Sequence, residues 1–240
     1  MRIVRFFLFL VLATTVSLVA GGCGNDTTEP PVDTGEAEVL FMQAAPAAGE
    51  ADLFVNGSEI HSDIAFGDAS DGYEEMDAGS QQVRILENGS ISRLLVDKSI
   101  DFTKDEHYTI FAVNDSAGTE FDAVVFKDDL SAPAAGKAHI RLANLVPDGP
   151  SMKLSFQGAG LGAIISNVAF KDNSEFFTPV DAAAVTLRVQ ENGNSGGSSG
   201  GLAENLPYTL EDGGIYTIAV VGMVADSSAM ITVIKHEDNH

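Results

Sequence analysis

The stretch AHIRLANLVP, residues 138–147, follows the pattern of AEVLFMQAAP, residues 37–46, at an offset of 101. Three further pairs continue this alignment at offsets of 101, 104 and 108: residues 52–57 with 153–158, residues 84–89 with 188–193, and Tyr108 with Tyr216. The offset grows only at turn sequences, which is typical of loop insertions. We therefore predict a duplicated domain.

Each copy carries the pattern of short β-strands. Apolar residues alternate with polar ones, as in Val83 and Ile85, and this alternation predicts strands with one buried face. Asn-Gly pairs at 56–57, 88–89 and 192–193 are typical of tight hairpin turns. The fold class that follows is all-β, with two tandem antiparallel β-sandwich domains of the immunoglobulin-like type.

A tyrosine near the end of each copy supports the sandwich prediction. Residues 212–218, DGGIYTI, resemble the tyrosine-corner region of immunoglobulin-like domains, in which a tyrosine hydroxyl bonds to the backbone of the preceding corner. We expect Tyr216 and its counterpart Tyr108 to make this contact, although neither copy has the cysteine pair or the core tryptophan of antibody domains.

Domain boundaries follow from composition. Residues 128–138, DDLSAPAAGKA, are small, rich in Pro, Gly and Ala, and lack apolar periodicity. This places a first domain at 37–128, a linker at 129–137 and a second domain at 138–236. Residues 23–36 are polar, acidic and contain two prolines, so we expect a flexible tether there.

The first 22 residues have the composition of a secretory signal peptide. Arg2 and Arg5 precede the apolar run FFLFLVLA, and small residues continue to Gly22. The strongly apolar part is too short to favour a spanning helix. The sequence therefore predicts export.

Cys23 is the single cysteine of the chain, which excludes an intrachain disulfide. The preceding residues LVAGG resemble the lipobox of bacterial lipoproteins, although Ala20 stands where that motif usually has leucine. The resemblance implies cleavage before Cys23, acylation of this cysteine, and anchoring in membrane lipid. Gly24, in place of the aspartate that favours inner-membrane retention, implies the outer membrane.

Three stretches resemble a known bacterial family of exported β-domains. They are the strand ADLFVNG at 51–57, the segment IAFGDASD at 64–71 with its counterpart Val168-Ala169-Phe170, and the seam at 128–133. Together they resemble the domain-of-unknown-function family 4397. The resemblance implies tandem β-domains and an exported location. It brings no catalytic or ligand-binding residues.

The chain is strongly acidic, with 35 Asp and Glu against 13 Lys and Arg. Such a surface repels nucleic acid and anionic headgroups, so a nucleic-acid partner is excluded. Asp68, Asp71 and Asp77 lie close together in the sequence with Glu74 and Glu75, and oxygen ligands of this kind suit calcium. Solvation alone also explains them, because no calcium-loop motif is present.

Motifs that suggest chemistry lack the context that such chemistry needs. Residues 193–197 match Gly-x-Ser-x-Gly, but a Gly/Ser tract rather than a helix follows them. The glycines at 158–162 lack a strand–helix–strand unit. His61, Ser62 and Asp63 are consecutive, and neighbours on a strand face opposite ways, so they cannot form a relay. His236 and His240 lie at an acidic tail, where a weak metal site is the alternative to a solvated tail.

These observations predict a non-enzymatic, lipid-anchored envelope protein that presents loops to a protein or glycan ligand. Phe176, Phe177 and Tyr73 are candidates for exposed contact residues, with burial in the core as the alternative. Two other functions stay open: a hydrolase of envelope polymers, and a calcium-binding adhesion-type surface protein. No cofactor other than calcium is expected.

Overall fold

A computed structural model describes residues 35–89, 93–115, 117–158, 163–174, 177–192 and 203–237 of the chain. Its regular structure consists of β-strands and one short 3-10 turn, η1 (Pro46–Ala48). The described residues belong to one compact unit, Asp33–His240. The prediction of an all-β protein built from sandwiched sheets is therefore confirmed. Within the described ranges, no helix is long or apolar enough to cross a membrane.

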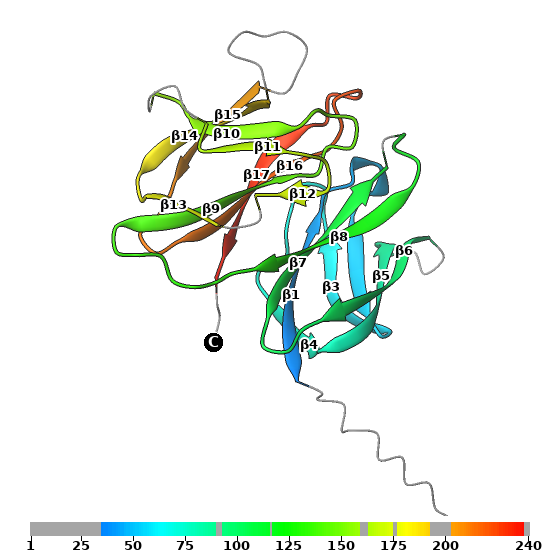
Figure 1. Cartoon of the computed structure of the whole chain (residues 1–240). Helices are drawn as coiled ribbons and strands as arrows, with labels where there is room; N and C mark the ends of the chain where they lie inside the picture. Colours follow the sequence, from blue (N-terminus) through cyan, green and yellow to red (C-terminus); the bar gives the residue numbers. More distant parts are fainter. Residues whose placement is uncertain are drawn as a thin grey trace, which may run out of the picture. The chain divides into compact units, whose positions relative to one another are not determined.

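The first half of the unit contains eight strands in two four-stranded sheets (Figure 1). One sheet has the order β4-β1-β7-β8 and the other has the order β3-β2-β5-β6. Their bounds are β1 (Glu36–Gln43), β2 (Ala51–Val55), β3 (Ser58–Ile64), β4 (Glu74–Asp77), β5 (Gly79–Glu87), β6 (Leu94–Phe102), β7 (His107–Asn114) and β8 (Phe121–Asp128).

The second half repeats this pairing order. One sheet runs β12-β9-β16-β17, with β13 also paired to β9, and the other runs β11-β10-β14-β15. Their bounds are β9 (Lys137–Asn144), β10 (Met152–Phe156), β11 (Ile165–Val168), β12 (Asp172–Asn173), β13 (Thr178–Asp181), β14 (Ala184–Glu191), β15 (Ala203–Thr209), β16 (Ile215–Val221) and β17 (Met230–His236). Residues 129–136 join the halves without regular structure.

The immunoglobulin-like subtype is not confirmed. In that fold the first strand belongs to the sheet that contains the second, in the order A-B-E-D. Here β1 and β2 lie in different sheets, and β1 pairs in parallel with β7. In the second half β9 pairs in parallel with β16 in the same way. The prediction of purely antiparallel sandwiches is therefore corrected by one parallel pair in each half.

The predicted tyrosine contact is present in both halves. Tyr108 on β7 accepts a hydrogen bond of 3.0 Å from the backbone nitrogen of Thr103. Tyr216 on β16 accepts one of 3.0 Å from the backbone nitrogen of Glu211. In each case the donor lies five residues upstream, so the contact forms although the strand order is not that of an immunoglobulin domain.

Local backbone geometry also recurs at the offsets found in the sequence. Left-handed backbone occurs at Asp63 (φ 60°) and at Asn167 (φ 64°), 104 residues later. The side chain of Asn88 donates to the Asp63 side chain at 2.6 Å, and that of Asn192 donates to the Asn167 side chain at 3.2 Å. Equivalent turns in the two halves are therefore stabilised by equivalent side chains.

Three hydrophobic clusters make up the core. One lies inside the first half and contains Phe41, Leu53 and Ile85, and a second lies inside the second half and contains Leu154 and Ile218. The third cluster joins the halves. Its members come from β1, β7, β8, β9, β16 and β17 and from the adjoining loops: Leu40, Met42, Ala44, Tyr73, Phe111, Val113, Val124, Phe126, Ala143, Leu145, Ala219, Val221 and Ile234.

The third cluster buries the second face of the two inner sheets. Every residue of β16, IYTIAVV, is buried, and only the first residue of β7 is partly exposed. Near-continuous apolar runs of this kind are typical of strands covered on both faces. The two inner sheets therefore pack against each other, and each outer sheet covers one of them.

Candidate functional site

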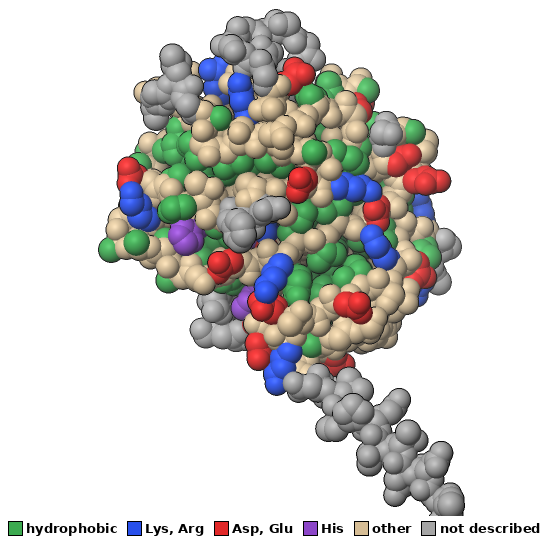
Figure 2. Space-filling model, in the orientation of Figure 1, with side chains coloured by type: hydrophobic (Ala, Val, Ile, Leu, Met, Phe, Trp, Pro, Cys, Tyr) green, Lys and Arg blue, Asp and Glu red, His purple; other side chains and the backbone are tan. Residues whose placement is uncertain are grey.

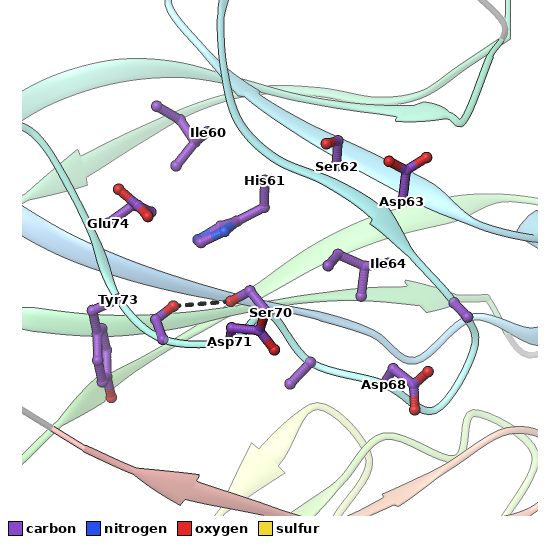
Figure 3. A pocket seen from close by; sticks show the side chains of 13 residues that line it. Ile60, His61, Ser62, Asp63, Ile64, Asp68, Ser70, Asp71, Tyr73 and Glu74 are labelled. Carbon is purple, nitrogen blue, oxygen red and sulfur yellow. Dashed lines mark hydrogen bonds between the residues drawn. The ribbon is translucent and has the colours of Figure 1, made fainter. Parts of the chain in front are cut away.

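An open hollow lies beside β3 and the segment that leads into β4. It has a volume of about 790 Å³ and is lined by residues 60–65 and 68–74 (Figure 3). Four of its side chains carry carboxylates, namely Asp63, Asp68, Asp71 and Glu74, and the lining contains no Lys or Arg. The hollow therefore presents a strongly acidic lining to solvent.

The three predicted calcium ligands do not converge. Asp68 and Asp71 line this hollow, whereas Asp77 lies at the end of β4 and lines another hollow, with Glu36 and Gln81. Within the described ranges, no group of three or more His, Cys, Asp or Glu side chains is placed to hold a metal ion. Calcium binding stays a prediction, and calorimetry at millimolar calcium tests it.

His61 faces the hollow but is held by the backbone. Its Nε2 lies 2.9 Å from the carbonyl oxygen of Val39, which fixes that nitrogen as the donor. Burial lowers the pKa of His61, while the bond to Val39 and the charge of Glu74 oppose this shift. Figure 3 shows Ser62 and Asp63 away from the imidazole. The hollow thus presents carboxylates and a neutral imidazole rather than a catalytic relay.

A second polar site is buried between the halves. We call it the inter-half ring, and it consists of Tyr73, Asp128, Arg141, Thr217 and His236. Tyr73 precedes β4 and Asp128 ends β8, while Arg141, Thr217 and His236 lie on β9, β16 and β17. All five side chains are nearly inaccessible, with Arg141 and Asp128 each 2% exposed.

The members of the ring contact one another in sequence. The Arg141 guanidinium forms an ion pair with Asp128 through Nη2, and its Nε lies 2.8 Å from Thr217 Oγ1. Thr217 Oγ1 lies 2.6 Å from His236 Nε2. Tyr73 Oη lies 2.6 Å from His236 Nδ1 and 2.7 Å from Asp128 Oδ2, which closes the ring.

Aromatic groups and two further donors complete the surroundings of the ring. The Arg141 guanidinium carbon lies 4.9 Å from the ring centre of Phe177 and 5.5 Å from that of Phe126, both within cation–π range. Thr109 donates to Asp128 at 2.6 Å, and Arg141 Nη1 donates to the Lys127 carbonyl at 3.1 Å. Every charge in the ring is therefore paired.

Burial dominates the electrostatics of the ring. It lowers the pKa of His236 to about 4, and the nearby charge of Asp128 opposes this shift. Burial also raises the pKa of Tyr73, with the charge and hydrogen bond of Asp128 acting in the same direction. At neutral pH the ring therefore holds a neutral imidazole and a neutral phenol beside one ion pair.

The sequence interpretation missed this ring. Asp128 was assigned to the end of a domain and His236 to an acidic tail, yet both are buried. Arg141 was the available signal, because a charged residue inside the apolar strand sequence 138–147 requires a buried partner. Tyr73 is a buried member of the ring, so the alternative of core burial holds for it. Phe177 is half-buried against the Arg141 guanidinium.

Several predictions concern residues outside the described ranges. They are the signal peptide and Cys23, most of the tether, Gly160 and Gly162 of the glycine motif, the Gly-x-Ser-x-Gly match at 193–197, Phe176 and His240.

Comparison with known proteins gives one family match. The model of a domain of unknown function (DUF4397) matches residues 37–155. This range covers β1–β8, the connection that follows and the next strand, β9, and it ends inside β10. No curated protein matches the chain.

Proposed function

We propose that this chain is an exported, lipid-anchored protein of the bacterial cell envelope, with a structural or binding role rather than a catalytic one. In this proposal the membrane partner is reached through acylated Cys23, and the folded unit meets a protein or glycan ligand. The observation that carries the proposal is the position of Cys23. It is the single cysteine in 240 residues, and it follows a charged start, an apolar run and small residues.

Lipid anchoring fits the spacing between Cys23 and the fold. Twelve residues separate this cysteine from β1, which begins at Glu36. Fully extended, they would span at most roughly 40 Å. Each buried methylene of an acyl chain contributes about 0.8 kcal/mol, so two or more chains hold a soluble domain stably.

The recurring contacts support tandem copies that arose by duplication. Pairing order, left-handed positions and the tyrosine contact recur at the offsets of the sequence alignment. At neutral pH the third hydrophobic cluster and the inter-half ring hold the two copies in one arrangement. An arrangement of this kind suits the display of loops in a fixed geometry.

Metabolic labelling with a fatty-acid analogue tests the anchor. The full chain should be labelled and should sediment with membranes, whereas the Cys23→Ser variant should lose both the label and the sedimentation. Gly24→Asp is the matched variant for sorting. It should keep the label and move the protein from the outer to the inner membrane. Labelling that persists in Cys23→Ser would refute the anchor.

The face of the membrane and the binding role need a separate test. Protease treatment of intact cells reports whether the folded unit is outside the cell. A glycan array and cross-linking in intact cells then sample the two ligand classes. Saturable binding of one class would support the binding role, while its absence from both would favour a spacer.

A further inference from the structure

The contacts of the inter-half ring allow only one arrangement of protons. Asp128, paired with Arg141 as a carboxylate, can only accept hydrogen bonds. Tyr73 must therefore donate its one hydroxyl proton to Asp128. Its oxygen is then free only to accept, so His236 Nδ1 carries a proton and donates it to Tyr73.

The contacts on the other side of the ring fit the same arrangement. A guanidinium can only donate, so Arg141 Nε donates to the oxygen of Thr217. Thr217 then has one proton for the remaining contact, with His236 Nε2 at 2.6 Å. Because Nδ1 already carries the single proton of a neutral imidazole, Nε2 is unprotonated and accepts this proton. His236 is thus a neutral imidazole with its single proton on Nδ1, and both of its nitrogens are satisfied.

A second proton on His236 would break this arrangement. It would sit on Nε2 and point at Thr217 Oγ1, so the threonine proton would lose its acceptor. Two cations, His236 and Arg141, would then meet at one hydroxyl. The other ionisable groups near the imidazole are Asp128, Tyr73 and His107. Asp128 favours the charged imidazole, whereas Arg141, His107 and burial oppose it.

We propose that the inter-half ring is an acid-sensitive latch, which fastens the two halves while His236 is neutral and releases them when it takes a second proton. Each half keeps its own hydrophobic cluster, so each sandwich would stay folded on release, whereas separation of the inner sheets would expose the third cluster. Residues 129–136 would still tether the two halves.

The direction of the pH effect follows from the depressed pKa of His236. The open form binds the extra proton near pH 6.5, and the closed form binds it only near pH 4. The contribution of the latch is therefore complete above about pH 6.5 and is lost as the pH falls towards 4. The equilibrium between closed and open forms shifts by at most about tenfold per pH unit, or roughly 300-fold in all.

Imidazole NMR on the ¹⁵N-histidine-labelled full chain tests the proton arrangement directly. One histidine, identified by its absence from His236→Gln, should show the Nδ1–H tautomer at pH 7.5. It should take a second proton only near pH 4. An Nε2–H tautomer, or titration near pH 6.5 in the folded protein, would overturn the proposal.

Small-angle scattering between pH 7.5 and pH 4 tests the release. The radius of gyration of the full chain should rise in this interval while far-ultraviolet circular dichroism stays constant. His236→Gln keeps one donor and one acceptor but cannot titrate, so its radius should not change. His139→Gln is the matched control outside the ring and should behave as the parent. A constant radius in the parent, or an equal rise in His236→Gln, would refute the latch.

A second variant guards against misfolding of His236→Gln. Tyr73→Phe removes the acceptor of the Nδ1 proton and one donor to Asp128. The closed form is weakened while His236 remains titratable. Release should therefore occur at a higher pH than in the parent, and an unchanged midpoint would contradict the proposal.

Discussion

The two halves of this protein share a strand order but differ in charge and in the face they present to each other. The first half, residues 36–128, carries 20 Asp and Glu against 5 Lys and Arg, whereas residues 137–237 carry 10 against 6. Figure 2 shows Lys and Arg side chains lying among Asp and Glu side chains on one face of the molecule. One ion pair, between Lys171 and Asp122, joins the two halves. Seven of the 20 acidic residues of the first half lie on β3, on β4 and in the segment between them that lines the hollow.

Equivalent positions on the inner sheets complement each other rather than repeat. Phe111 corresponds to Ala219, and Met42 corresponds to Ala143, so a large residue in one half has a small counterpart in the other. Asp128 corresponds to His236, and the two meet through Tyr73. A duplicated surface can pack on its own copy in this way when size and charge have diverged.

The largest loss of stability is expected when Asp128, the counterpart of His236, is replaced. Asp128→Ala leaves Arg141 buried without its counter-ion, so we expect a loss of about 3–5 kcal/mol in the free energy of unfolding. Asp122→Ala on the same strand removes more exposed ion pairs and should cost less than about 1 kcal/mol. Urea titration of both variants measures the difference.

The double variant Asp128→Leu with Arg141→Met sharpens this test. Removing both charges avoids the unpaired cation, so most of the lost stability should return. If the double variant is as unstable as Asp128→Ala, the ring contributes through its shape rather than through charge pairing.

A smaller loss of stability is expected when Ala219 of the second half is replaced by phenylalanine, the residue at the equivalent position of the first half. Ala219→Phe adds a phenyl group to the third hydrophobic cluster, which is already closely packed. It should lower the free energy of unfolding by about 1–3 kcal/mol. Ala184→Phe at the exposed start of β14 is the control and should change stability by no more than about 0.5 kcal/mol. Equal melting temperatures for the two variants would show that the inner sheets are loosely packed.

The smallest effect concerns a feature that the halves share. Tyr108→Phe and Tyr216→Phe each remove one hydroxyl bond to the backbone and should each cost about 1 kcal/mol. Tyr208→Phe on β15 is the comparison, because no hydroxyl bond of Tyr208 is found in the described part of the chain. Thermal unfolding that responds at one position only would show that the two contacts are not equivalent.

Much of the architecture could be predicted from local sequence, because strands and turns depend on short-range patterns. Alternation at Val83 and Ile85 predicted β5, and Asn56-Gly57 predicted the turn that joins β2 to β3. The tyrosine contact was also predictable, since donor and acceptor lie five residues apart. The strand order was not, because the parallel pairing of β1 with β7 joins residues about 70 positions apart.

The candidate site was less accessible from sequence. Asp68 and Asp71 are close in the chain and line the same hollow, whereas Asp77, at the end of β4, lines another. Tyr73 and His236 are separated by 163 positions, and no local pattern joins them.

The sequence by itself determined that this chain forms strands and turns in a pattern used twice, since residue spacing and turn chemistry act over a few residues. Only the tertiary structure decided that the two patterns pack through their inner sheets and bury one ion pair with its imidazole. The physical reason is that burial of a charge depends on partners brought together from distant strands. Those partners are recognisable only when the sheets have been placed face to face.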